Sequence, residues 1–214
     1  ETSGSTASTQ PAVQGGTLVY GTYGETPTYD PLMTFDAPTV GTPNYAIYDT
    51  LMRLEDGKPV PYLAQSMETT DDGTTWVMTL REGVEFHGGE PFDAAAVVFN
   101  IERHIEGPSR SAAQVAAIES VEATGPLEVT FTLATPWAAF PAIFTVTPGF
   151  IASPTAIERF GEDYGRNPVG AGPFKVDSLI PDDRTVLVRN ENYWQPGLPL
   201  LDSLIFRPIP DHQV

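Results

Sequence analysis

Cysteine is absent from the chain, and basic residues are scarce. Without cysteine there is neither a disulfide framework nor thiolate chemistry. Only 11 of the 214 residues are Lys or Arg, against 28 Asp or Glu, so the formal net charge is -17. Nucleic acids and anionic membrane surfaces are bound through Lys and Arg, so we expect neither as a partner. The acidity itself favours solubility and is compatible with neutral or cationic ligands.

Long hydrophobic runs and the common catalytic motifs are also missing. No run approaches the ~18 residues that a membrane-spanning helix needs. His87, His104 and His212 are far apart and lack the spacing of a zinc site, so we expect no bound metal. The segment from Gly170 to Phe174 is only superficially like a phosphate loop, because Pro173 removes an amide and a predicted strand follows. We therefore expect no catalytic residue and no cofactor.

Turn and capping signals between hydrophobic segments predict an α+β fold. Hydrophobic residues make up 41% of the chain, enough for a substantial core. Asp71-Asp72-Gly73 separates two alternating segments, 66–70 and 74–81, and predicts a β-hairpin, because glycine accepts the positive φ of a tight turn. Asp93 is a good N-cap for a helix over 94–104, since its carboxylate can accept from the amides of the first turn.

Further elements follow from hydrophobic spacing, and the chain has no internal repeat. Hairpins and helices succeed one another without a regular βαβ alternation, which favours hairpins packed on helices. The remaining predicted elements are a strand at 17–22, a helical segment at 43–54, a helix at 112–118, a hairpin of 119–124 with 127–135, a helix at 153–160 with Ser153 as its cap, and three strands of one antiparallel sheet at 174–179, 185–189 and 203–208.

The N-terminal segment is small, polar and without core residues. We expect residues 1–14 to be a disordered tether. A spacer of this kind often follows the lipidated cysteine of a bacterial lipoprotein, and an ordinary flexible terminus has the same composition. Both interpretations stay open.

Three spaced blocks carry a resemblance to a known family. They are Leu63–Val98, Pro168–Phe174, and Val188–Trp194 followed by 199–210. In this order and spacing the chain resembles the family 5 extracellular solute-binding proteins, which include oligopeptide-, dipeptide- and nickel-binding proteins. The chain departs from the family pattern in scaffold turns: Gln65 replaces a Glu, Met67 a Trp, Gly88 an Asp, and Ala95-Ala96 an acidic pair.

The resemblance implies a fold and a division of the chain. The fold is α+β, the N-terminal lobe of a type II, cluster C periplasmic-binding-protein fold, with a mixed sheet and a nested hairpin–helix subdomain. Residues 15–44 and 163–214 would form the sheet core of lobe I, and 45–162 the nested subdomain. Members of the family are about twice as long, so the second lobe is expected to be absent from this chain. A partly uncovered hydrophobic face should result.

The resemblance also implies a function. The chain would belong to a monomeric solute receptor of an ABC importer that captures an oligo- or dipeptide between two lobes and delivers it to the membrane permease. It would act in the periplasm or on the extracellular face, reaching the membrane only through a lipid anchor. One cleft wall is expected from three loops: Tyr23, Gly24, Glu25 and Thr26; Asn44 and Tyr45; and Thr145, Val146 and Thr147.

Several alternatives remain at this point. Glu25 either pairs with a ligand amine or is a solvated loop acid. Within the family the ligand could instead be a nickel chelate or an oligosaccharide. A carbohydrate-active enzyme needs two facing carboxylates about 5–10 Å apart, and the sequence offers no obvious pair. A plain adhesion domain would be compact and would have no cleft.

Overall fold

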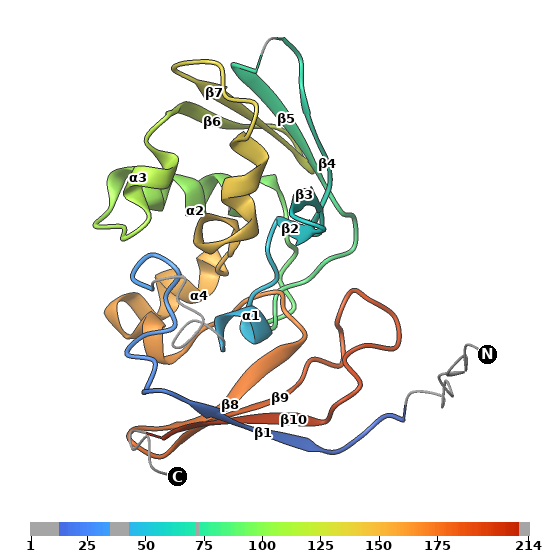
Figure 1. Ribbon diagram of the computed structural model, residues 1–214, viewed down its shortest axis with the longest axis vertical. Helices are drawn as coiled ribbons and strands as arrows, with labels where there is room; N and C mark the ends of the chain where they lie inside the picture. The colour runs from blue at the N-terminus through green and yellow to red at the C-terminus, as the bar shows by residue number, and fades with distance from the viewer. Residues whose placement is uncertain (1–12, 35–42, 72, 210–214) are drawn as a thin grey trace, which may run out of the picture.

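The computed structural model describes residues 13–34, 43–71 and 73–209. Within them lie two four-stranded sheets, with the helices between them (Figure 1). The strands are β1 (Thr17–Thr22), β2 (Met52–Glu55), β3 (Lys58–Pro61), β4 (Ala64–Thr69), β5 (Thr75–Leu80), β6 (Ile118–Gly125), β7 (Glu128–Leu133), β8 (Phe174–Ile180), β9 (Arg184–Arg189) and β10 (Ser203–Pro208). The helices are α1 (Asn44–Ile47), α2 (Ala94–Glu106), α3 (Ala112–Val115) and α4 (Pro154–Phe160), with 3-10 turns η1 (Phe140–Thr145), η2 (Thr147–Gly149) and η3 (Gly161–Arg166).

The sheet at the bottom of Figure 1, called the lower sheet, has the strand order β1-β10-β9-β8. β8, β9 and β10 are antiparallel to one another, as predicted, and β1 joins β10 in parallel. The two ends of the described chain are therefore tied together. The Asp202 carboxylate accepts from the Gly16 amide at 2.8 Å, and the Thr17 and Ser203 hydroxyls are 2.6 Å apart.

The sheet at the top of Figure 1, called the upper sheet, has the order β4-β5-β7-β6. Both predicted hairpins are confirmed, and Gly73 has the expected positive φ of 106°. The Asp71 carboxylate accepts from the backbone amides of Gly73, Thr74 and Thr75 at 2.9–3.0 Å. Trp76 and Met78 share the buried face of β5, as the alternating pattern predicts.

Two predicted helix caps are also confirmed. Asp93 accepts from the Ala96 amide at 2.9 Å at the start of α2, and Ser153 accepts from the Ala156 amide at 3.2 Å at the start of α4. Each cap pairs an amide that the helix itself leaves unpaired, and such a cap is worth about 1 kcal/mol. No helix among the described residues is both long and hydrophobic enough to cross a bilayer.

Two helix predictions are wrong in extent. The spacing in 43–54 predicted a helix, but α1 ends at Ile47 and the chain continues extended into the β2–β3 hairpin. Tyr48 and Leu51 are both completely buried in this extended segment, so their spacing reflects burial from several sides and not one helix face. The helix at 112–118 is the four-residue α3, because Ile118 already pairs in β6.

The described core consists of two clusters, one for each sheet. The upper cluster is built on Phe131, Phe140 and Phe144, whose ring centroids are 5.2–5.4 Å apart. In the lower cluster, Tyr48 donates to the Tyr29 carbonyl at 3.0 Å, and the Tyr48 and Tyr164 hydroxyls are 2.9 Å apart. These hydroxyls satisfy one another inside the core, where an unpaired polar group would be destabilising.

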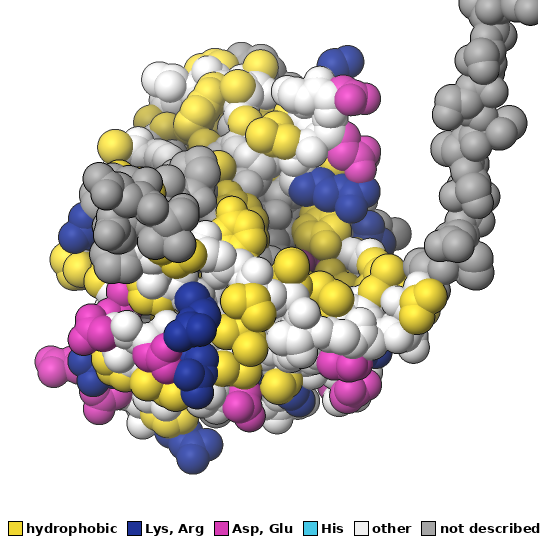
Figure 2. All heavy atoms as spheres, turned by 60° about the horizontal axis from the view of Figure 1, so that its bottom comes forward, with side chains coloured by type: hydrophobic (Ala, Val, Ile, Leu, Met, Phe, Trp, Pro, Cys, Tyr) yellow, Lys and Arg dark blue, Asp and Glu magenta, His cyan; other side chains and the backbone are white. Residues whose placement is uncertain are grey.

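β1 is the least covered strand of the molecule. Among the described residues it pairs only with β10, so its other edge is open. Leu18 is 48% exposed, Val19 57% and Tyr20 44%, so hydrophobic side chains on both faces of the strand meet solvent. Figure 2 shows hydrophobic side chains interspersed with charged ones on this side of the molecule. Exposed hydrophobic side chains thus lie along β1, on both faces of the strand.

Candidate functional site

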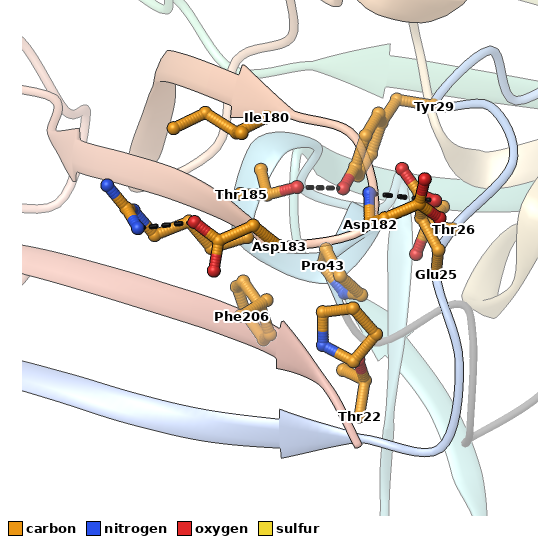
Figure 3. Close-up of a pocket in the computed structure, with 12 residues that line it drawn as sticks. Thr22, Glu25, Thr26, Tyr29, Pro43, Ile180, Asp182, Asp183, Thr185 and Phe206 are labelled. Atoms are coloured by element: carbon orange, nitrogen blue, oxygen red, sulfur yellow. Dashed lines mark hydrogen bonds and ion pairs between the residues drawn. The ribbon is translucent and has the colours of Figure 1, made fainter. Parts of the chain in front are cut away.

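Four of the nine residues predicted to form a cleft wall line a hollow, and these four are divided between two separate hollows. Glu25 and Thr26 line a small cavity beside the β8–β9 turn, together with Tyr29 and Thr185 (Figure 3). The cavity volume is only about 10 Å³, room for about one water molecule. As described, this cavity is too small to hold a ligand.

The side chains of this cavity are already engaged with one another. The Tyr29 hydroxyl lies 2.6 Å from the Thr185 hydroxyl, and burial raises the pKa of Tyr29. The Asp182 amide donates to Glu25 Oε2 at 3.3 Å (Figure 3). Asp182 has a positive φ of 62°, which is unfavourable for a residue with a side chain. Glu25 therefore supports the strained β8–β9 turn, whether or not it also meets a ligand.

Tyr45 and Thr145 line the second hollow, an open groove of about 400 Å³. It lies at the corner where α1, β2 and η1 meet, and we call it the Asp49 groove. Its other lining residues are Tyr48, Asp49, Thr50, Arg53, Leu54 and Tyr62. A groove of this size, with aromatic walls and a few polar groups, has the general form of a small-ligand site.

Asp49 is the buried charge of this groove. It is 4% exposed, and its Oδ2 accepts from the Tyr193 hydroxyl at 2.8 Å and from Trp194 Nε1 at 2.7 Å. Burial raises the pKa of Asp49 to about 6, although these hydrogen bonds favour the ionised form. At neutral pH the carboxylate is ionised and fastens the loop after β9 to the corner after α1.

Two arginines and two aromatic rings contact one another in series at the same corner, and the two rings meet edge to face. The Arg53 guanidinium lies 5.0 Å from the Tyr62 ring centroid, Tyr62 and Trp194 are 5.4 Å apart, and the Arg81 guanidinium lies 4.9 Å from the Trp194 ring. Arg81 Nε also donates to the Tyr62 carbonyl. Of these four residues Arg53 and Tyr62 line the groove, and the cation–π contacts favour their present positions.

The other predicted residues differ in accessibility. Tyr23 is 62% exposed and Tyr45 43% exposed, the latter with its ring edge against Phe150 at 4.8 Å. Gly24 and Val146 are half-buried. Asn44 and Thr147 are 1% exposed and Thr145 is 8% exposed, its hydroxyl donating to the Ala142 carbonyl at 2.8 Å. Asn44 and Thr147 thus offer almost no surface in this state.

Sequence reasoning missed Asp49, Arg53 and Tyr62. Tyr193 and Trp194 belong to one of the blocks that carry the family resemblance, but the sequence predicted no place for them in the site. The signal that links them is invisible in sequence, because Asp49 and Trp194 are 145 positions apart. Only the folded chain shows that the motif's hydrogen-bond donors meet a buried carboxylate.

The two described histidines, the half-buried His87 and the buried His104, each lie within hydrogen-bonding distance of a partner inside the fold. His87 Nε2 lies 3.0 Å from the Gly172 carbonyl, and burial lowers the pKa of His87 to about 4. His104 Nδ1 lies 2.6 Å from the Ser109 hydroxyl, and burial lowers its pKa to about 4 as well. Among the described residues, no group of three His, Asp or Glu side chains is arranged to hold a metal ion.

Comparison with known proteins agrees with these features. Residues 58–214 match the family "Bacterial extracellular solute-binding proteins, family 5 Middle". The chain belongs to this family. The glutathione-binding protein GsiB of Shigella flexneri is 37% identical to it over 153 residues, which are 70% of this chain and 30% of that protein. The family and this relative are binding proteins by description.

Solved structures share the fold. The periplasmic binding protein DppA of Helicobacter pylori, in complex with the peptide STSA, is 28% identical with a TM-score of 0.83, covering 94% of this chain and 44% of that one. MoaA of A. tumefacien R10, in complex with mannopinic acid, is 30% identical with a TM-score of 0.85, covering 94% and 42%. The expected fold, the N-terminal portion of a type II periplasmic binding protein, is confirmed. The chain spans under half the length of these proteins and about a third of the curated relatives.

Proposed function

We propose that this chain is part of the solute-binding component of an ABC importer and supplies one wall of its ligand cleft. The observation that carries the proposal is the combination of family membership with an open β1 edge and a groove that no second wall covers within the described residues. A binding site divided between two walls leaves each wall open when it is alone.

The lobe would be organised as the resemblance implied. Residues 15–44 and 163–214 would form its sheet core, and 45–162 a nested subdomain. The two hydrophobic clusters follow the two sheets, but the lower cluster also takes Ala46, Ile47, Tyr48, Phe150, Ala152 and Ala156 from 45–162, so the two parts share a core. A second lobe, in sequence outside this chain, would face the Asp49 groove and cover part of β1.

The ligand would be a short peptide. Support comes from the glutathione-binding relative at 37% identity and from the relative in complex with the peptide STSA. The charges at the groove are the buried Asp49 carboxylate, which is held by Tyr193 and Trp194, and the half-exposed Arg53 guanidinium, which pairs with Glu55 and is the one that a ligand carboxylate could reach. Aromatic walls at Tyr45 and Tyr62 would accept side chains.

Capture would work by a shift between open and closed states. A ligand that contacts both lobes only in the closed state binds that state better, and so favours closure. The permease would recognise the closed shape. The protein would act as a monomer outside the cytoplasmic membrane, with a lipid anchor as its membrane contact, and would carry out no catalysis.

Calorimetric titration with glutathione tests the proposal. The full-length protein should bind it or a related short peptide. The 214-residue chain alone should bind at least about 100-fold more weakly, because half of the contacts are missing, and 100-fold corresponds to about 2.7 kcal/mol. Equal affinity of the two would show that the chain encloses its own site and would refute the divided cleft.

A second candidate ligand is an amino-acid–sugar conjugate. The relative in complex with mannopinic acid matches this chain with a TM-score of 0.85 at 30% identity, slightly above the peptide-bound relative. Such a ligand also carries carboxylate and amine groups, so the charges of the groove do not separate the two classes. A competition experiment with glutathione and mannopinic acid on the full-length protein would separate the two classes.

A further inference from the structure

A different hollow lies at the turn that precedes α2, away from the Asp49 groove. Its volume is about 340 Å³, and most of its wall is hydrophobic. Phe86, Pro91, Phe99 and Pro154 contribute to this wall, from the turn, from α2 and from the start of α4. The proposed importer function does not use this hollow.

Both charged residues that line the hollow are acidic, Glu90 and Asp93. The Asp93 carboxylate is engaged as the N-cap of α2. Glu90 Oε2 is buried and has no hydrogen-bond partner among the described residues. A buried carboxylate oxygen without a donor is destabilising, and native structures pair nearly all such atoms. Turning this carboxylate toward the hollow that Glu90 lines and pairing it with a donor would therefore be favourable.

The position of this carboxylate depends on Gly88. A Cβ atom at residue 88 would lie 2.3 Å from Glu90 Oε2 and 2.9 Å from Oε1. The family pattern has Asp at this point of the turn, and this chain departs from it. With glycine, the Glu90 carboxylate can lie back over the turn at the edge of the hollow. Any other residue at position 88 has a Cβ atom, and the Glu90 carboxylate would then have to move away from the turn.

We propose that this hollow binds a lysine or arginine side chain of a partner protein. The methylene groups of such a side chain would lie against Phe86, Phe99 and Pro154, and the cationic end would donate to Glu90. Charge complementarity supports this occupant: no Lys or Arg lines the hollow, and the chain carries a net charge of -17. A long side chain with a hydrophobic stem and a cationic end fits both properties of the wall.

The test uses two capped tripeptides that differ in one group. Acetyl-Gly-Lys-Gly-amide is the probe, and acetyl-Gly-norleucine-Gly-amide has the same hydrophobic stem without the ammonium. NMR shifts of the Gly88, Gly89 and Ala95 amides are followed in the full-length protein. A single side chain should bind with a Kd on the order of 1 mM, and the norleucine peptide about tenfold more weakly.

Three variants locate the binding. Glu90→Gln removes the charge and should weaken the lysine peptide about tenfold, to the level of norleucine. Gly88→Ala keeps the charge but displaces the carboxylate, and should also weaken binding. Glu85→Gln changes an exposed acid of the same turn and should change nothing. The thermal midpoint of each variant is measured, and Glu90→Gln should not lower it, because the replaced oxygen is unpaired.

The proposal fails on any of three results. These are equal binding of the lysine and norleucine peptides, equal weakening by Glu90→Gln and Glu85→Gln, and no shift at peptide concentrations about tenfold above 1 mM. If Glu90→Gln unfolds the protein, the proposal is tested by Gly88→Ala alone, and unchanged binding of the lysine peptide by that variant would refute it. None of these outcomes bears on glutathione binding in the cleft, so the two proposals can fail separately.

Discussion

The two four-stranded sheets use the same kinds of residue in different ways. In the upper sheet, Met78, Val129 and Phe131 are completely buried, and the strands have a hydrophobic cluster of their own. In the lower sheet, Leu18 and Val19 of β1 are about half exposed and the strand has an open edge. The lower sheet also buries Leu187, Leu204 and Phe206 in a cluster of its own, so the contrast is confined to β1, its uncovered edge strand. Under the proposed function, β1 is the edge that the second lobe would cover.

The largest loss in the free energy of unfolding is expected from a change in the hydrophobic cluster of the upper sheet. Phe131→Ala removes a ring that contacts Phe140 and Phe144, and should destabilise the protein by about 3–5 kcal/mol. The matched change in β1, Val19→Ala, should alter stability of this chain by less than about 0.5 kcal/mol. Urea unfolding measures both. Similar losses at the two positions would mean that β1 is as well packed as the upper sheet.

Acid should act with opposite signs on the two described histidines and on Asp49. The folded pKa of His87 and of His104 is lowered to about 4, so their stabilising effect is present above pH 6.5 and is lost as pH falls through 4. The folded pKa of Asp49 is raised to about 6, so its stabilising effect is present below 3.8 and is lost as pH rises through 6.

The net result is a loss of stability between pH 6.5 and 4, because two histidines oppose one aspartate. In Asp49→Asn the compensating gain is missing, so unfolding free energy between pH 7 and 4 should fall by about 2 kcal/mol more than in the unchanged protein. Denaturant unfolding at a series of pH values measures this. Parallel pH curves for the two proteins would show that the Asp49 carboxylate is not held in a buried, charge-disfavouring site.

Removing the Asp49 side chain should detach the loop after β9. Asp49→Ala leaves the Tyr193 hydroxyl and Trp194 Nε1 without their shared acceptor and should cost about 2 kcal/mol. Asp49→Asn keeps an oxygen acceptor and should cost less at pH 7. The chain has three tryptophans, so tryptophan fluorescence is measured in a Trp76→Phe, Trp137→Phe background, in which Trp194 gives the signal. An unshifted spectrum in Asp49→Ala would contradict the role given to this carboxylate.

The sequence predicted the helix caps and the tight turn, because these features depend on residues that are close together in the chain. Asp93 and Ser153 cap helices through amides three residues away, and Gly73 supplies a positive φ within its own turn. The 43–54 segment was misjudged because contacts distant in sequence, such as the Thr50–Phe150 bridge, hold it extended. The Asp49 groove could not be predicted for the same reason, since its parts meet only through the fold.

The smallest effect on this chain should come from the surface of β1. Val19→Thr keeps the branched shape, and should leave the stability of the 214-residue chain unchanged within about 0.5 kcal/mol. In the full-length protein the same change should destabilise, because it places a hydroxyl in a face that the second lobe or a returning strand covers. Thermal unfolding of both lengths gives the comparison, and an equal response in the two would argue against coverage.

Hydrogen exchange at β1 tests the central claim most directly. In the 214-residue chain, the β1 amides that do not face β10 should exchange as freely as those of an open sheet edge. In the full-length protein the same amides should be protected, and a bound ligand should increase the protection further. Identical exchange of β1 in the two proteins would contradict the account of this chain as one part of a divided binding site.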